Sequence, residues 1–187
     1  MSWRSILERG FCIIGSTMYD MKHLANATYD LCIPSAPGHA EIKTQLHIRY
    51  SCHCVSVSTK YQQPLAPGTV EHSFLIFDDR GLARFFCPTK HALSTMLPSI
   101  FQSIISRKLF HTAGKNFLLI EYASNGNNKS YLVFFSVTKD TNGLKIYVES
   151  AYPDDAGISK RNQRPISARV VLAKQFRGEA IKKTPPR

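Results

Sequence analysis

The stretch Tyr131–Pro153, YLVFFSVTKDTNGLKIYVESAYP, decides the fold of this chain. Two runs rich in β-branched and aromatic residues, Tyr131–Lys139 and Leu144–Tyr152, flank the tetrapeptide Asp140-Thr141-Asn142-Gly143. An Asn-Gly pair between such runs is a strong signal for a hairpin turn. The stretch therefore predicts two antiparallel strands, and Phe117–Tyr122 predicts a strand before them.

A helical pattern precedes this meander. After Thr89, which suits an N-cap, apolar residues recur at i, i+3 and i+4 spacing for about four turns. They are Leu93, Met96, Leu97, Ile100, Phe101, Ile104, Ile105 and Leu109. This pattern predicts one long central helix, packed on the sheet. Because Pro98 interrupts it, we expect a kink or two abutting helices, with Ser94 or Thr95 capping the second.

Further strands are expected earlier and later in the chain. From Gln45 to Cys54 apolar and polar residues alternate, which is typical of a half-buried strand. The runs 74–77 and 82–86, joined by Asp-Asp-Arg-Gly, predict a hairpin. Residues 166–173 predict a long final strand.

These elements indicate an α+β fold with a mainly antiparallel sheet. Residues 1–40 carry weak helical periodicity and end in a segment with two prolines and a glycine, so we expect a helical arm and a linker. Residues 41–187 are expected to form a single domain with a basic C-terminal segment.

Positive charge is concentrated at the C-terminus. Residues 160–187 hold nine Lys or Arg and one acid, Glu179, and so carry +8 of the formal net charge of +11. A focused positive field favours a polyanion, because binding releases counterions from phosphates. The expected nucleic-acid-binding residues are Lys160, Arg161, Arg164, Lys174, Arg177, Lys182 and Lys183. A solvated basic tail without a partner is the alternative.

The five cysteines are an odd number without disulfide spacing, which fits a reducing compartment, and no apolar run reaches the length of a membrane span. We therefore expect a cytoplasmic protein that has no membrane partner. The sequence Cys52-His53-Cys54 suggests either a zinc site or a thiol nucleophile. A zinc site would need a second paired motif and a nucleophile would need a flanking catalytic motif, and the sequence has neither. Buried free cysteines are favoured, and no metal or cofactor is expected.

Polar positions of the strands suggest chemistry instead. Alternation places Ser136 with Thr138 on one side of their strand and, separately, Tyr147 with Glu149 on one side of theirs. If these positions share a sheet face with Arg169, His111 and Lys115, they make a site with a base, hydroxyls and cations. Cleavage of RNA without metal needs a base, a cation and an acid. The expected catalytic residues are His111, Lys115, Arg169, Glu149 and Ser136, with His47 and His53 as second choices for the proton-transfer residue. The alternative is that each of these side chains simply lies on the solvated face of a half-exposed sheet and has no catalytic role.

Three segments, His47–Cys54, Arg84–Pro98 and Tyr147–Pro153, are similar to uncharacterised proteins of bacterial prophages and mobile elements, some of the stationary-phase adaptation type. This resemblance implies a bacterial, mobile-element setting. The order of elements also resembles ribonuclease toxins of the barnase, colicin and RelE type, in architecture alone.

The sequence thus predicts a small protein that acts on nucleic acid, with RNA favoured over DNA. If it is a metal-independent endoribonuclease, it would be a toxin or an antiviral defence effector. Such a toxin would have an acidic antitoxin as its partner. The alternative is a non-enzymatic module that binds nucleic acid or an acidic partner protein through its basic end.

Overall fold

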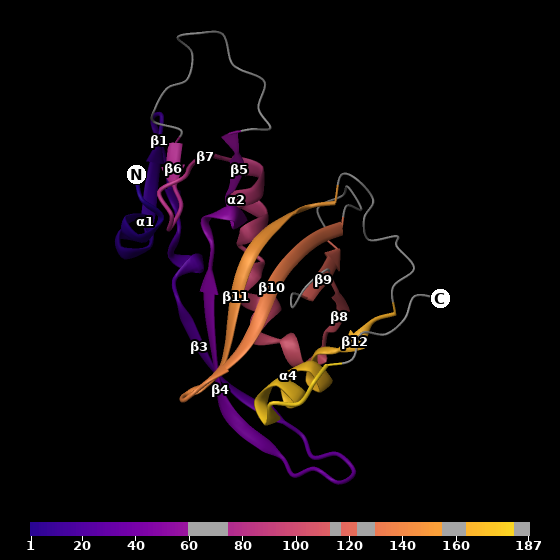
Figure 1. Cartoon of the computed structure of the whole chain (residues 1–187). Helices are drawn as coiled ribbons and strands as arrows, with labels where there is room; N and C mark the ends of the chain where they lie inside the picture. Colours follow the sequence, from indigo (N-terminus) through magenta and orange to yellow (C-terminus); the bar gives the residue numbers. More distant parts are fainter. Residues whose placement is uncertain (60–74, 113–116, 123–129, 155–163, 182–187) are drawn as a thin grey trace.

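The computed structural model describes residues 1–59, 75–112, 117–122, 130–154 and 164–181 (Figure 1). In these ranges the chain is α+β, with much more strand than helix. The strands form a large sheet, a smaller sheet and a separate hairpin, and all but one of their pairings are antiparallel. The expected fold class, α+β with a mainly antiparallel sheet, is confirmed.

The hairpin expected from Tyr131–Pro153 lies in the middle of the large sheet. Its strands are β10 (Ser130–Asp140) and β11 (Gly143–Pro153), paired antiparallel along their length. Gly143 has a φ of +139°, and a Cβ at this position would lie 2.3 Å from the Gln45 carbonyl oxygen. The turn into β11 therefore requires glycine, for its backbone angle and for its lack of a side chain.

In the described residues, seven strands make up this sheet, in the order β12-β8-β9-β10-β11-β4-β3. The remaining five are β12 (Ile166–Ser167), β8 (Lys108–His111), β9 (Phe117–Tyr122), β4 (Ile42–Tyr50) and β3 (Ala27–Ile33). β11 and β4 run parallel, whereas the other neighbours are antiparallel. This parallel pairing joins the N-terminal part of the chain to the hairpin.

β4 follows the expected alternation, since Leu46, Ile48 and Tyr50 are buried while Arg49 is exposed. The strand ends at Tyr50 and does not continue to Cys54 as expected. Residues 52–54 form the 3-10 helix η2 instead, in which the thiols of Cys52 and Cys54 are still buried.

The smaller sheet contains the second expected hairpin. Its strands are β5 (Ser56–Ser58), β6 (Leu75–Phe77) and β7 (Ala83–Phe86), in the order β5-β7-β6. The hairpin of β6 and β7 was expected from the Asp-Asp-Arg-Gly turn, and it is confirmed for the described residues.

The long central helix is replaced by three short segments, α2 (Pro88–Ser94), α3 (Leu97–Gln102) and the 3-10 helix η5 (Ile104–Ser106). Pro98 lies in the first turn of α3, where its missing N–H costs nothing, whereas inside a continuous helix it would remove a hydrogen bond. The two abutting helices are as expected.

The expected caps of the second helix are wrong. Met96 occupies the N-cap position of α3, while the hydroxyls of Ser94 and Thr95 donate to carbonyl oxygens of the preceding turn. The apolar face is nonetheless core, as expected: Leu97, Ile100, Phe101 and Ile104 are buried. Phe101 packs edge-to-face on Phe135 of β10, with ring centroids 5.5 Å apart.

The long final strand expected at residues 166–173 is wrong. Only β12 is extended there, and α4 (Ala168–Arg177) follows and packs on β10 and β11 (Figure 1). The buried residues Ala168, Val171 and Leu172 lie at helical spacing, which outweighs the strand preference of the valines.

The helical arm and linker expected at residues 1–40 are also corrected. This segment holds α1 (Trp3–Arg9), the hairpin β1 (Phe11–Ile14) and β2 (Thr17–Asp20), η1 (Lys22–Leu24), and then β3. The expected boundary near residue 40 falls between β3 and β4, two strands that are hydrogen-bonded to each other. In the described ranges, no helix is long and apolar enough to cross a membrane.

Candidate functional site

A cavity of about 390 Å³ opens where η2, the turn from β6 to β7 and β11 meet. We call it the His53 cavity. It is lined by Ser51, Cys52, His53, Asp78, Asp79, Arg80, Leu82, Arg84, Tyr147 and Glu149. Most of these side chains are polar or charged, and they come from three distant parts of the chain.

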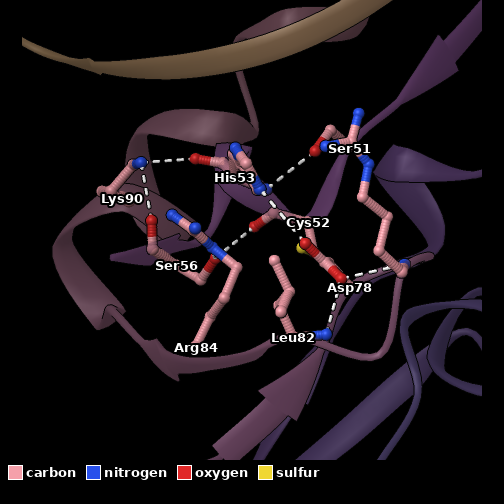
Figure 2. Close-up of polar contacts among 9 residues, drawn as sticks. Ser51, Cys52, His53, Ser56, Asp78, Leu82, Arg84 and Lys90 are labelled. Carbon is pink, nitrogen blue, oxygen red and sulfur yellow. Dashed lines mark hydrogen bonds and ion pairs between the residues drawn. The ribbon is translucent and has the colours of Figure 1, made fainter. Parts of the chain in front are cut away.

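His53 is placed by the turn that ends β4. The Ser51 hydroxyl oxygen accepts a hydrogen bond from the His53 backbone N–H at 3.2 Å, which fixes the start of η2 (Figure 2). Burial lowers the pKa of the His53 imidazole, the nearby cations Arg84 and Lys90 lower it further, and Asp78 opposes them. His53 is therefore mainly neutral near pH 7 and can accept a proton.

Asp78 faces His53 across the cavity, with Oδ2 3.8 Å from Nε2 of the imidazole. Its Oδ1 accepts hydrogen bonds from the backbone N–H groups of Arg80 at 2.9 Å and Leu82 at 2.8 Å. Partial burial acts to raise the Asp78 pKa, but these two donors, together with the nearby His53 and Arg84, outweigh it, and the pKa lies below its ordinary value. Asp78 is thus ionised at neutral pH and stabilises an imidazolium on His53.

Arg84 supplies a cation from β7. Its Nε donates to the Ser56 hydroxyl at 2.8 Å, and that hydroxyl donates to the Cys52 carbonyl at 2.7 Å. The guanidinium is therefore held by this hydrogen bond, and Arg84 also lines the cavity. This chain of bonds links β7 to η2 (Figure 2).

Lys90, in α2, holds the backbone next to the cavity. It is 7% exposed, and its ammonium donates to the carbonyl oxygens of Ser56, at 2.8 Å, and of His53 (Figure 2). Burial lowers its pKa to about 8. A buried ammonium that bridges two carbonyls ties the residues on either side of Cys54 together and holds the backbone of His53.

Tyr147 and Glu149 reach the cavity from β11. Burial raises the pKa of the Tyr147 phenol, although a hydrogen bond with Ser51 acts to lower it, so the hydroxyl keeps its proton at neutral pH. Glu149 lies where the pairing of β10 and β11 shifts by one residue, since Phe135 faces Val148 and Phe134 faces Ser150. Such a bulge leaves an extra residue and can redirect its side chain.

The cysteines do not form a reactive centre. Burial raises the pKa of Cys52 to about 11 and that of Cys54 to about 12, so both thiols are protonated at neutral pH. All five cysteines are free thiols. Among the described residues, no group of three His, Cys, Asp or Glu is arranged to hold a metal ion.

The structure separates the catalytic residues expected from the sequence. Ser136 lies opposite Tyr147 on the same sheet face, and Glu149 lines the His53 cavity. His111 is on β8, beside the Phe117 ring at 5.2 Å, and Arg169 is exposed on α4; neither lines this cavity. Lys115 lies outside the described residues.

The expected nucleic-acid-binding residues are only partly described. Lys160, Arg161, Lys182 and Lys183 lie outside the described residues, and Arg164 is exposed before β12. On α4, Lys174 donates to the Ala180 carbonyl at 3.4 Å, and Arg177 forms an ion pair with Glu179. Part of this charge is therefore used within the C-terminal segment itself.

Asp78 and Arg84 are site residues that the sequence did not single out for chemistry. Asp78 was interpreted as an ordinary turn residue, which it also is, and Arg84 lies in a strand with no distinguishing motif. The only signal was a charged residue on either side of a hairpin turn, and it did not indicate His53 as the third partner.

The comparisons with known proteins identify a family and give no further relative. The model of the YjaZ family matches residues 11–176, a range that includes every residue lining the His53 cavity. No curated protein and no solved structure matches the chain. The chain therefore belongs to the YjaZ family.

Proposed function

We propose that this YjaZ-family protein acts on RNA and cleaves it without a metal ion in the His53 cavity. One observation carries the proposal: a half-buried histidine with a lowered pKa shares a cavity with a carboxylate, Asp78, and a guanidinium, Arg84. Phosphodiester cleavage by the ribose hydroxyl requires a base whose pKa lies near the operating pH, and a fixed cation.

In the proposed reaction, His53 takes the proton of the ribose 2′-hydroxyl, whose oxygen then attacks phosphorus. The bond from phosphorus to the 5′-oxygen of the next nucleotide breaks, and the Tyr147 hydroxyl donates a proton to that oxygen. The products are a 2′,3′-cyclic phosphate and a free 5′-hydroxyl. Arg84 stabilises the charge on the transition state, and Asp78 stabilises the imidazolium that forms on His53.

The proposal keeps one expected catalytic residue and replaces others. Glu149 stays as a cavity residue, while His53 takes the role first expected of His111, and Arg84 that of Arg169. In the cell, we expect the activity of a cytoplasmic toxin or defence effector whose action is held back by an acidic antitoxin.

A binding module without catalysis is the second candidate. It is favoured by the exposed cations Arg164 and Arg169, which flank the start of α4 and lie outside the His53 cavity. Such a module would bind RNA or an acidic protein through this end and would leave RNA intact.

The decisive experiment incubates the purified protein with total RNA, with and without EDTA, and analyses product ends. We expect cleavage that EDTA does not prevent and that His53→Ala abolishes. His39→Ala is the matched control, because His39 is exposed and does not line the cavity. Intact RNA with the parent protein would favour the binding module, and cleavage unchanged by His53→Ala would place the chemistry elsewhere.

A further inference from the structure

A second hollow, of about 340 Å³, adjoins the His53 cavity. The two share Asp79 and Tyr147 as lining residues, so a ligand can extend from one into the other. Residues of α1 line the second hollow together with residues of β4, which contributes Arg49. We call it the Arg49 hollow.

Arg49 and Tyr147 are neighbours by strand register. They are Cα partners in the parallel pair of β4 and β11, so their side chains lie on the same sheet face. Both are on the outer face, because the alternate residues Ile48, Tyr50, Ile146 and Val148 are buried. Arg49 therefore stands beside the phenol ring that separates the two hollows.

The Arg49 guanidinium is unengaged in the part of the chain that the structure describes, where it makes no hydrogen bond or ion pair. The other arginine of this hollow, Arg4, is paired with Glu8 at 3.0 Å. An exposed arginine whose donors are free can bind a phosphate with two hydrogen bonds. The hollow thus offers one unengaged cation, Arg49, for an anionic ligand, and the Asp79 carboxylate also lines it.

The floor of the Arg49 hollow is fixed. The Trp3 indole is 2% exposed, and its Nε1 donates to the Tyr50 carbonyl at 2.9 Å, which fastens α1 to the end of β4. The same end of β4 leads into η2 and His53. The segment from the end of β4 into η2 therefore contributes residues to both hollows and fixes their order along the chain.

We propose that the Arg49 hollow is a second nucleotide subsite, in which Arg49 binds the phosphate next to the one held in the His53 cavity. This inference rests on the proposed function and deepens it. Tyr147 lies between the subsites, where its ring can stack on a base, as aromatic side chains do in single-stranded RNA sites. The ligand is a single-stranded RNA that spans both hollows.

The test measures binding of uncleavable oligonucleotides, with deoxyribose at the scissile position, so that it does not depend on cleavage. For a longer oligonucleotide, Arg49→Ser should weaken binding about tenfold, as for removal of one charge-assisted hydrogen bond. The slope of log K against log salt should fall by about 0.7, the value for one phosphate of a single strand. A dinucleotide should be affected far less.

Two variants control this test. Arg49→Lys keeps the charge and should restore most of the binding, which shows that weaker binding by Arg49→Ser is not misfolding. Arg9→Ser removes an exposed arginine at the end of α1 that lines neither hollow, and should leave binding unchanged. A decrease in affinity that is equal for both ligand lengths, or no decrease with either, would overturn the subsite.

The outcome also separates this inference from the proposed function. Length-dependent, Arg49-dependent binding without any cleavage would support the subsite and refute the ribonuclease. Cleavage with no Arg49 effect on binding would do the reverse. If an oligoglutamate peptide binds through Arg49 and the oligonucleotide does not, the surface serves an acidic protein and the nucleotide subsite is wrong.

Discussion

The His53 cavity and the basic C-terminal segment differ in how they hold charge. In the cavity, Asp78 and Arg84 are fixed by hydrogen bonds to backbone and side-chain groups, and so is the buried Lys90 next to it. At the C-terminal end, Arg164 and Arg169 are exposed, and the charges of α4 that do bond use neighbours close in sequence.

Net charge and local chemistry are therefore encoded in different parts of the chain. The C-terminal segment dominates the composition, yet exposed charges act at long range and are screened by salt. The His53 cavity adds almost nothing to the net charge because its acids and bases nearly balance, but burial and fixed partners shift their pKa values. The proposed function therefore places the chemistry in the cavity and the long-range attraction at the C-terminal end.

The largest effect is expected in catalysis. His53→Ala should lower RNA cleavage by about 10² to 10⁴-fold, the usual contribution of a general base. His111→Ala and Arg169→Ala, outside the cavity, should keep near-parental activity, measured as single-turnover rates on a defined RNA. The assignment to the cavity would be reversed if the two outer variants lost activity and His53→Ala did not.

The next effect concerns the packing under α4. Ile104, in η5, is 1% exposed, and η5 contacts α4. Ile104→Ala should lower the free energy of unfolding by about 2–5 kcal/mol, the range for truncation of a buried aliphatic side chain. Chemical denaturation measures it, with Ile13→Ala as an exposed control. A midpoint within error of the parent would show that this face is not buried.

A third prediction tests Lys90, the buried cation next to the cavity. The folded-state pKa of Lys90 is about 8 and its ordinary value is 10.5, so between these pH values the unfolded chain binds a proton that the folded protein has lost. The Lys90 contribution to the free energy of unfolding therefore rises with pH through this window, by about 3 kcal/mol at about 1.4 kcal/mol per pKa unit.

The measurement is the difference between the parent and Lys90→Met in urea denaturation, taken at several pH values. Subtraction removes the opposite contributions of Tyr50, Cys52 and Cys54, whose pKa values are raised by burial. A difference that does not change with pH would mean that the Lys90 ammonium is solvated and does not hold the backbone of His53.

The smallest effect belongs to the C-terminal segment. Replacing Lys160, Arg161 and Arg164 together with Ser should weaken RNA binding and reduce the salt slope by about 0.7 for each phosphate that is no longer neutralised. Single-turnover cleavage at saturating protein should change little, because the cavity is untouched. Lys43→Ser, which removes an exposed lysine of β4, is the control. An unchanged slope would reject this segment as the main RNA-binding surface.

The sequence predicted local features well. The turn before Gly143 and the alternation of Leu46, Ile48 and Tyr50 both depend on nearby residues. The register that places Ser136 opposite Tyr147 was not predicted. The prediction failed at α4, where adjacent valines favour a strand while the helical spacing of the buried residues is decided by packing on β10 and β11.

The candidate site was the least predictable part. His53, Asp78 and Glu149 meet because β11 pairs with β4 in parallel and because the β6–β7 turn folds over η2. Neither pairing leaves a trace in local periodicity. The sequence could therefore name histidines and acids as candidates, but it could not choose His53 over His111.

The parallel pairing of β4 with β11 also has a consequence for how the protein is made. His53 leaves the ribosome well before Tyr147 and Glu149, which belong to a strand that is synthesised much later. During translation the cavity thus lacks one wall until β11 is made, so a shorter nascent chain carries His53 without Tyr147 and Glu149. For the proposed ribonuclease, cleavage would begin only after β11 has been synthesised, which would delay harm to the RNA of the translating cell.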